Sequence, residues 1–245
     1  REVLEKIKVD NIQLYEMTFS DGRKIECCEN PLWSVRKNGK DNRILKTSEI
    51  RDNLSYNKYN SKYKKYHPYY INAVPINDLL PYSEKELPID PYYLGLWLGD
   101  GDKTDTSICT IDNEIREYVK MYSEELGLQY IEKHPNNRTH IYNCNIVNKK
   151  GKLNPLREKL RDLNVFNNKH IPEIYLKSSY NQRVELLKGL LDTDGTVGKN
   201  GGVSFCSSNP NIQSTFLKLV RSLGIRVKET KKIKKCKGKS YNTCN

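Results

Sequence analysis

The sequence repeats itself, and this internal repeat limits the possible folds more than any other feature. The segment LGLWLGDG at residues 94–101 is echoed 94 residues later by KGLLDTDG at residues 188–195. Each copy closes a predicted apolar helix, which begins near Pro91 or near Asn181 and ends in an Asp-Gly pair. Two copies of one helix end predict a molecule with two related halves.

The two copies are followed by the same succession of elements. A short apolar strand comes first, and then an amphipathic helix that stops at a glycine, Gly127 or Gly224. These later matches are offset by 97 residues, which predicts a loop three residues longer in the second copy. The expected elements are 107–110, 113–126, 129–134, 139–147 and 155–163 in the first copy, and 204–207, 210–223, 226–232 and 240 onward in the second.

The residues before the repeats have a different character. Residues 14–19 and 23–27 flank a turn at Gly22 and predict a β-hairpin. Lysines and tyrosines interleave over residues 36–70 without apolar periodicity, which indicates either a solvated loop or a nucleic-acid surface. We therefore expect an α+β protein in three parts: a β-rich segment with a basic, tyrosine-rich loop at 1–80, a first repeat at 85–165, and a linker with a second repeat at 166–245.

The net charge of the chain indicates the class of its binding partner. The chain has 42 Lys and Arg against 30 Asp and Glu, a net charge of +12. This surplus favours nucleic acid over a membrane, because basic side chains gain affinity by displacing counterions from phosphates. A merely soluble basic protein remains the alternative. Double-stranded DNA is the partner that we expect.

Other sequence features concern the compartment. There is no apolar run of about 18 residues, as a transmembrane helix needs, and no signal-peptide pattern at the start. The seven cysteines form no CxxC pair, and an odd number does not suit a disulfide framework. We expect an intracellular protein with reduced thiols and no structural zinc.

The repeated helix end can carry chemistry if the two helices pack together. Gly95 and Gly189 remove side chains from one face of each helix, so the backbones can approach about a pseudo-twofold axis. Asp100 and Asp194 would then meet where the last carbonyls lack partners and the helix dipoles are negative. Such an oxygen cluster suits Mg²⁺ or Mn²⁺, although each Asp-Gly alone is also typical of a simple helix-ending turn. The predicted metal ligands are Asp100, Asp194, Gly99 and Thr193.

These two segments resemble the paired motifs of the LAGLIDADG homing endonucleases. The closer match is LKGLLDTDG at residues 187–195, and YLGLWLGDG at 93–101 resembles the divergent first motif of intein-borne members. The resemblance implies two αββαββα repeats in a monomer with internal pseudo-twofold symmetry. It also implies that each four-stranded sheet lies in the DNA major groove, and that both strands are cut across the minor groove. By position, the metal-binding acids of the family fall on Asp100 and Asp194.

A further match concerns Lys169. The segment KHIP at residues 169–172 resembles the Lys-x-Ile-Pro that commonly precedes the second motif, so Lys169 is a candidate catalytic residue. The alternative is a surface lysine before a helix. A symmetric partner would fall near position 266, beyond Asn245, so we expect a second repeat that is incomplete, either as a fragment or through decay.

Residues 1–35 resemble, less specifically, the N-terminal half of an intein splicing (Hint) domain. Cys28 stands where that domain usually has threonine, and Pro31 stands where its histidine belongs. Proline has no imidazole to protonate a scissile amide, and the chain opens at Arg1 rather than at a Cys or Ser nucleophile. We do not expect this chain to splice itself.

Basic residues of the predicted strand pairs are candidates for DNA contact. Between Arg226 and Lys239 the only acid is Glu229, which indicates a phosphate-binding edge, although a solvated loop is the ordinary alternative. The bases of the target cannot be read from the sequence, because strand register and DNA deformability leave no motif. The predicted DNA-binding residues are Lys133, Arg138, Lys231, Lys232, Lys234, Lys235, Lys237 and Lys239.

The sequence thus predicts a site-specific, metal-dependent DNA endonuclease derived from an intein. The runner-up is a non-cleaving nucleic-acid binder on the same fold, such as an RNA maturase or a decayed endonuclease. Two acids facing a phosphate favour the enzyme, because binding alone does not need them.

Overall fold

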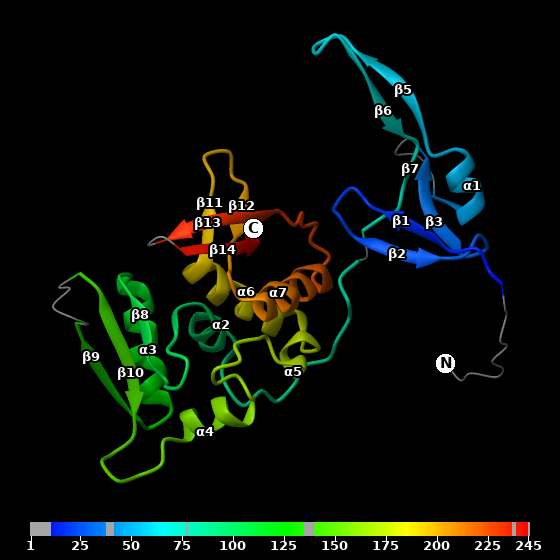
Figure 1. Ribbon diagram of the computed structural model, residues 1–245. Helices are drawn as coiled ribbons and strands as arrows, with labels where there is room; N and C mark the ends of the chain where they lie inside the picture. The colour runs from blue at the N-terminus through cyan, green and yellow to red at the C-terminus, as the bar shows by residue number, and fades with distance from the viewer. Residues whose placement is uncertain (1–10, 38–41, 77, 135–139, 237–238, 245) are drawn as a thin grey trace, which may run out of the picture. The chain divides into compact units, whose positions relative to one another are not determined.

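The computed structural model describes residues 11–37, 42–76, 78–134, 140–236 and 239–244, of which 231–236 and 239–244 are described by their backbone alone. It divides into two compact units, Arg1–Ile76 and Asn77–Asn245. The expected boundary at residue 80 lies a few residues later. Helices and strands are mixed throughout, so the predicted α+β class is confirmed (Figure 1).

The first unit begins with the expected hairpin. Strand β1 (Tyr15–Thr18) pairs antiparallel with β2 (Lys24–Cys27). Gly22 in the turn has a φ of +87°, a conformation that other residues rarely adopt. The turn residue and the hairpin are therefore both confirmed.

A small sheet and one helix follow in the same unit. The sheet has the order β4-β3-β7, and Trp33 of β3 donates its indole N–H to Thr47 Oγ1 of α1 at 2.9 Å. Val35 and Ile50 are buried beside them and form a minimal core. The elements are β3 (Leu32–Lys37), β4 (Asn42–Lys46), α1 (Thr47–Asp52) and β7 (Asn72–Ala73).

The basic, tyrosine-rich stretch is not a loop, so that expectation was wrong. It forms a regular antiparallel hairpin of β5 (Ser55–Asn60) and β6 (Lys65–Tyr70). Alternation of apolar and polar residues signals a strand only where one face is buried, and here both faces are exposed. Tyrosine instead favours strands through its intrinsic preference and its cross-strand pairs.

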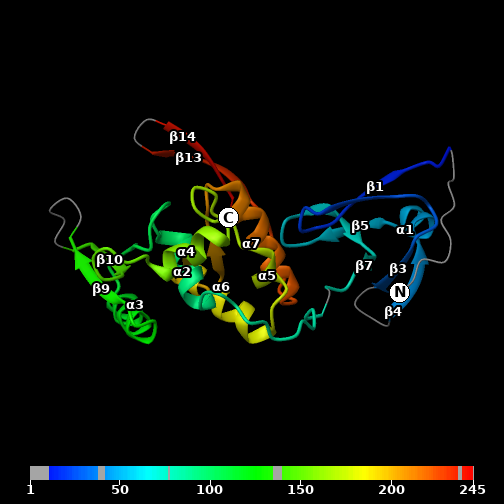
Figure 2. The same cartoon turned by 90° about the horizontal axis from the view of Figure 1, so that it is seen from below.

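Two helices form the centre of the second unit. Helix α2 (Pro91–Asp100) begins at Asp90, whose carboxylate accepts from Tyr93 N, with Pro91 in the first helical position. Helix α6 (Tyr180–Asp194) begins with a capping box at Ser179. Both helix starts agree with the sequence prediction, and the two helices lie side by side (Figure 1, Figure 2).

The first repeat carries a three-stranded antiparallel sheet of order β8-β10-β9 with α3 packed on one face. Four strands were expected, but residues 101–107 join the described sheet only through a bridge between Gly101 and Ile108. The reason is local, because Asp102 and Asp105 accept the N–H groups of Thr104 and Thr106 and turn the chain. The elements are β8 (Ile108–Thr110), α3 (Asn113–Glu125), β9 (Gln129–Lys133), β10 (Tyr142–Val147) and α4 (Pro155–Asp162).

The second repeat departs further from the expected sheet. Its described strands form two separate hairpins, β11-β12 and β13-β14. A strand was predicted from residue 226, which is wrong, because β13 begins at Lys231. In this register Lys231 pairs with Cys244, so residues 226–230 face no described strand. The elements are α5 (Glu173–Leu176), β11 (Gly195–Val197), β12 (Val203–Phe205), α7 (Pro210–Ser222), β13 (Lys231–Cys236) and β14 (Lys239–Cys244).

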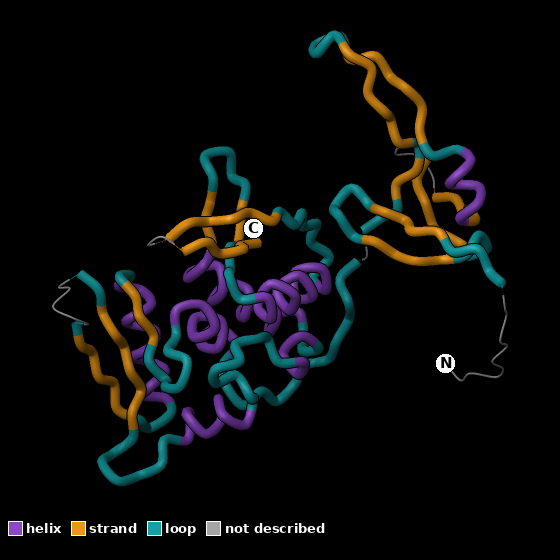
Figure 3. The backbone as a smooth tube through the Cα atoms, in the orientation of Figure 1, coloured by secondary structure: helices purple, strands orange, loops and turns teal. Residues whose placement is uncertain are grey.

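The core of the second unit is continuous across both repeats. Trp97, Tyr93 and Leu186 are fully buried in it, and helices α2, α6 and α7 lie between the first-repeat sheet and the later hairpins (Figure 3). A cavity of about 660 Å³ remains in the second repeat, with an apolar lining that includes Phe205 and Phe216. In the described residues no helix is long and apolar enough to span a membrane.

Candidate active site at the ends of helices α2 and α6

The two central helices touch through their glycines. A Cβ atom added to Gly95 would lie 2.5 Å from Leu186 O and 2.9 Å from Gly189 Cα. One added to Gly189 would meet Tyr92 O and would lie 2.8 Å from Leu96 N. All four of these obstacles are backbone atoms, which cannot rotate away. The predicted close approach of the two glycines is therefore confirmed.

The contact continues to the C-terminal ends of the helices. The side chain of Thr193 lies against Gly99, where an added Cβ would come within 2.6 Å of Thr193 Cβ. Thr193 Oγ1 donates back to Gly189 O at 3.2 Å and to Leu190 O at 3.0 Å, which holds the side chain in this position. The helix ends are thus held at backbone distance.

A polar link between the helices was missed by the sequence analysis. Tyr92 Oη of α2 donates to Asp192 Oδ2 of α6 at 2.7 Å. The two acids near the end of α6 therefore differ in their surroundings. Asp192 joins the helices, whereas Asp194 lies at the helix end beside Asp100.

Asp100 and Asp194 are the last residues of their helices. Gly101 N donates to Trp97 O, and Gly195 N donates to Leu191 O. Neither glycine has a positive φ, and a Cβ at Gly101 would lie 2.5 Å from Trp97 Cδ1. Glycine is required here for space rather than for backbone conformation.

The electrostatics couple the two carboxyl groups. Burial raises the pKa of Asp194 above its ordinary value, the charge of Asp100 raises it further, and the charge of Lys169 opposes both effects. Asp100 is an exposed residue, yet partial burial of its carboxyl group also raises its pKa, with the charge of Lys169 opposing the rise and that of Asp112 adding to it. Two partly desolvated carboxylates that repel each other favour a bound cation.

Lys169 contributes a positively charged ammonium group at the C-terminal end of α2. Its Nζ donates to Gly101 O at 2.7 Å and to Gly99 O at 3.2 Å, and it lies 5.1 Å from the ring centroid of Trp97. Burial lowers the pKa of Lys169 to about 8, although the charges of Asp100, Asp194 and Asp102 oppose the shift. Lys169 is thus not the surface lysine of the alternative interpretation.

The segment that carries Lys169 is held by the beginning of α7. Asn209 Nδ2 donates to Lys169 O at 3.1 Å, and Ile171 N donates to Thr215 Oγ1 at 3.1 Å. Asn209 also caps α7 by accepting from Ile212 N. No local sequence pattern indicates that the side chain of Asn209 reaches Lys169, so this contact was missed by the sequence analysis.

The oxygen atoms at the helix ends fit a hard divalent cation. In the part of the chain that is described, no group of three or more His, Cys, Asp or Glu side chains could hold a metal. The available ligands are two carboxylates and main-chain carbonyls, and Gly99 O keeps one lone pair beside Lys169. Mg²⁺ and Mn²⁺ accept such sets because water and substrate phosphates complete their coordination.

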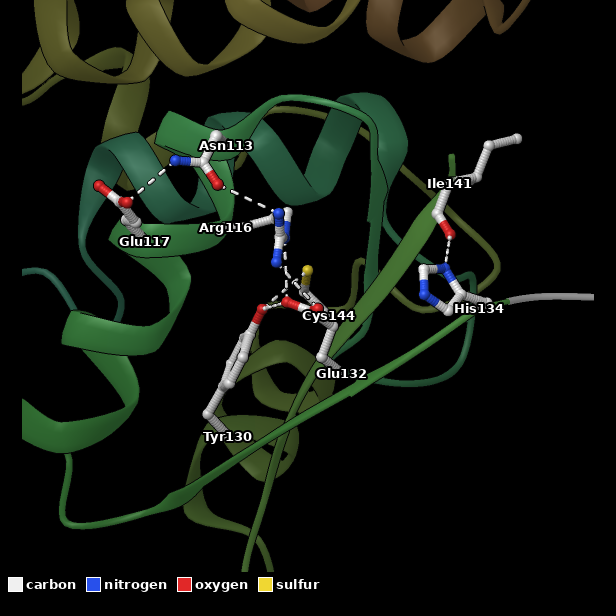
Figure 4. Close-up of polar contacts among 8 residues, drawn as sticks. All are labelled: Asn113, Arg116, Glu117, Tyr130, Glu132, His134, Ile141 and Cys144. Carbon is white, nitrogen blue, oxygen red and sulfur yellow. Dashed lines mark hydrogen bonds and ion pairs between the residues drawn. The ribbon is translucent and has the colours of Figure 1, made fainter. Parts of the chain in front are cut away.

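The register of the first-repeat sheet assigns its side chains to two faces. Toward α3, Arg116 donates to both Glu132 oxygens at 3.0 and 2.9 Å, and Tyr130 Oη donates to Glu132 at 2.6 Å and to Cys144 Sγ at 3.2 Å (Figure 4). The hydrogen bonds from Arg116 hold the pKa of Glu132 below its ordinary value. The opposite face presents the exposed residues Cys109, Gln129, Ile131 and Lys133.

The predicted DNA-binding residues fall partly outside the described structure. Lys133 is exposed at the end of β9. Arg138 and Lys237 lie outside the described residues. The structure places the backbone of the remaining lysines in β13 and β14 rather than in the expected connection between strands, and their side chains lie outside the description: Lys231, Lys232, Lys234, Lys235 and Lys239.

Comparisons with known proteins agree with the second copy of the repeat. Residues 181–243 match the family described as LAGLIDADG-like domain, and the match includes Asp194 and all of α6 except its first residue. The replicative DNA helicase DnaB of Mycobacterium intracellulare is 34% identical over 153 residues, which cover 62% of this chain and 22% of that protein. The chain thus matches about a fifth of the length of this curated relative.

Solved structures of the homing endonuclease I-DmoI are similar to the chain. Its mesophilic variants give a TM-score of 0.44 at 17% identity, covering 64% of this chain and 87% of that chain. The complex of I-DmoI with DNA and Ca gives a TM-score of 0.45 at 17% identity, covering 64% of this chain and 82% of that chain.

Proposed function

We propose that this chain is a site-specific double-strand DNA endonuclease that hydrolyses phosphodiester bonds with a divalent metal ion. The observation that carries the proposal is the glycine-packed pair α2 and α6, whose ends bring together Asp100, Asp194 and the half-buried Lys169. The LAGLIDADG-like match over residues 181–243 and the net charge of +12 support it.

In this proposal the helix ends hold the reacting phosphate and the metal. Asp100 and Asp194, with the carbonyls of Gly99 and Thr193, would hold Mg²⁺ or Mn²⁺. When bound, the metal supplies Lewis acidity and a water of lowered pKa. In hydrolysis a water oxygen would bond to phosphorus and its proton would pass to solvent, while the bond from phosphorus to the leaving oxygen breaks and that oxygen takes up a proton from solvent. Lys169, hydrogen-bonded at the end of α2, provides positive charge for the phosphate oxygens.

The exposed face of the first-repeat sheet is the proposed surface for DNA. Alternate residues of a strand point to the same face, so Gln129, Ile131 and Lys133 would share one side of the duplex contact. The lysine-rich strands β13 and β14 would supply phosphate contacts for the second repeat.

We also propose that the chain derives from an intein and that its first unit is a degenerate Hint-like segment. The match to only 22% of a DNA helicase supports an element carried within a longer protein. Pro31 in place of histidine leaves the first unit without the acid that splicing needs.

A non-cleaving nucleic-acid binder on the same fold, such as an RNA maturase or a decayed endonuclease, is the second candidate. It is favoured by the second repeat, whose described strands form two hairpins instead of one sheet.

The test compares binding with cleavage. A duplex is selected by binding to the chain from a randomised library and is then incubated with Mg²⁺ or Mn²⁺. We expect cutting of both strands by the parent and by Asp192→Asn, whose amide oxygen still accepts from Tyr92, and no cutting by Asp194→Asn. A parent chain that binds the selected duplex and never cuts it would establish the second candidate instead.

A further inference from the structure

The β5–β6 hairpin of the first unit has no face turned to a core. Every residue of β6 is exposed, and so is every residue of β5 except Asn60. Within its unit the hairpin extends as an arm beyond the small sheet (Figure 1). An isolated two-stranded ribbon is only marginally stable, so a contribution to the stability of the unit does not explain the presence of this arm.

The arm carries positive charge toward its tip and has no acidic side chain. No Asp or Glu occurs from Asn53 to Asn77, a stretch that contains four lysines. Lys58 Nζ lies 5.0 Å from the ring centroid of Tyr69, and Lys62 Nζ lies 5.5 Å from that of Tyr63. These ring contacts leave the ammonium groups accessible to an anionic partner. The four lysines are Lys58, Lys62, Lys64 and Lys65.

Tyrosines cover both faces of the arm. Tyr56 pairs across the strands with Tyr69 on one face, and Tyr59 pairs with Tyr66 on the other, each with ring centroids 5.2 Å apart. Tyr66 remains 70% exposed, so its hydroxyl is available for hydrogen bonds. Residues 55–70 contain no aliphatic Leu, Ile or Val, which argues against insertion into a membrane.

The arm is ordered at both ends. At its base Ile71 N donates to Leu54 O at 3.1 Å, and β7 then pairs with β3 of the small sheet. At its tip Asn60 Oδ1 accepts from Lys62 N at 3.1 Å and from Tyr63 N at 3.3 Å. A ribbon held in one conformation loses less conformational entropy on binding than a disordered tail of the same composition.

We propose that the β5–β6 hairpin is a second DNA-binding element, a ribbon that enters the major groove of double-stranded DNA. The B-DNA major groove is about 12 Å wide and admits a two-stranded β-ribbon. The A-form RNA major groove is too narrow for side chains to read. Lysines contact the phosphates on each wall, and tyrosine hydroxyls donate to phosphate or base-edge acceptors. The proposal extends the proposed function by giving the first unit a part in DNA binding.

The experiment removes charge from the arm and, separately, from an unrelated exposed turn. The arm variant carries Lys58→Gln, Lys62→Gln and Lys65→Gln in the full chain. The matched control carries Lys149→Gln, Lys150→Gln and Lys152→Gln, three exposed lysines of the second unit. Affinity for a labelled duplex of arbitrary sequence is measured by fluorescence anisotropy over a range of salt, with EDTA present so that no cleavage occurs.

We expect the arm variant to bind tens to hundreds of times more weakly, with a salt slope smaller by about 2 to 3, since each lost phosphate contact removes roughly 0.9 from that slope. The control should change much less. A second variant, Tyr63→Ser with Tyr66→Ser, should lose affinity at an unchanged salt slope. Circular dichroism checks that each variant is folded.

Equal losses in the arm variant and the control would overturn the proposal, and so would an arm variant that keeps the affinity and the salt slope of the parent. The result is separable from the proposed nuclease. If the parent binds DNA without cutting it, the proposed nuclease activity is refuted and the proposed role of the arm is not. If the parent cuts DNA and the arm variant binds with full affinity, only the proposed role of the arm is refuted.

Discussion

Replacing Gly95 by alanine should separate the two central helices. The added Cβ would lie 2.5 Å from Leu186 O, so the backbones must part by about 1 Å before ordinary contact at 3.4 Å is restored. Alanine gains about 1 kcal/mol in helix propensity, while overpacking against a backbone costs about 1–3 kcal/mol or more. Because backbone atoms cannot rotate away, the cost should lie at the upper end, about 3 kcal/mol. We therefore expect a net loss of about 2 kcal/mol, or roughly 4–8 °C in Tm for a chain of this size.

The same displacement should reach the site. A misplacement of about 1 Å can lower a rate by roughly a hundredfold, so cleavage should fall more than stability explains. Gly189→Ala should behave alike, and the double variant should cost less than the two single costs together, because helices already parted accept the second methyl group. Gly202→Ala, which meets no atom within 4 Å, is the control.

The assays are thermal unfolding by circular dichroism and single-turnover cleavage. A Gly95→Ala chain that is more stable than the parent, by the amount helix propensity provides, would refute the backbone contact between α2 and α6. Additive costs in the double variant would show that the two glycines act independently.

Four further predictions concern charge and burial. Asp194→Asn should retain salt-dependent DNA affinity while losing cleavage, and joint loss of both in a folded chain would contradict separate roles. The pKa of Asp194 is higher in the folded chain than in the unfolded chain. The protonated carboxyl group therefore stabilises the fold at low pH, and this stabilisation is lost as the pH rises through the folded pKa. Asp194→Asn should raise the Tm of the metal-free chain at neutral pH but not at low pH. Arg183→Met should cost about 2–4 kcal/mol in urea unfolding, because the guanidinium donates charge-assisted hydrogen bonds to Leu80 O at 2.6 Å and Ser222 O at 2.8 Å, and its loss leaves each carbonyl with a single backbone N–H donor. Neutralising four lysines together should weaken binding by a similar factor on all DNA sequences and flatten the salt slope, and unchanged affinity would reduce the run to a solvated strand: Lys231, Lys232, Lys234 and Lys235.

The sequence predicted the longer helices of the two repeats because their signals are local, whereas the short helix α1 was missed. Asp90 with Pro91, and Ser179 with Gln182, mark helix starts within one turn. Gly127 and Gly224 adopt φ values of +64° and +74°, as a helix stop requires. The approach of Gly95 to Gly189 followed from the repeat itself.

The remaining features depend on contacts that no local pattern encodes. Lys169 reaches carbonyl groups about 70 residues earlier in the chain, and Asn209 holds it from the other side. The turns at Asp102 and Asp105 form in place of a fourth strand, because their hydrogen bonds join residues that are at most two positions apart. The strands β5 and β6 were not predicted, because a ribbon that is exposed on both faces shows no alternation of apolar and polar residues.

The ammonium of Lys169 above Trp97 makes the candidate site observable by light. A positive charge 5.1 Å from an indole centroid imposes an electric field on the ring, and any ligand that draws the ammonium away changes that field. The other tryptophan, Trp33, belongs to the first unit and lies by Phe19, at 6.0 Å between ring centroids. In a Trp33→Phe chain, the emission of Trp97 alone would follow cation and DNA arrival in real time, without any attached dye.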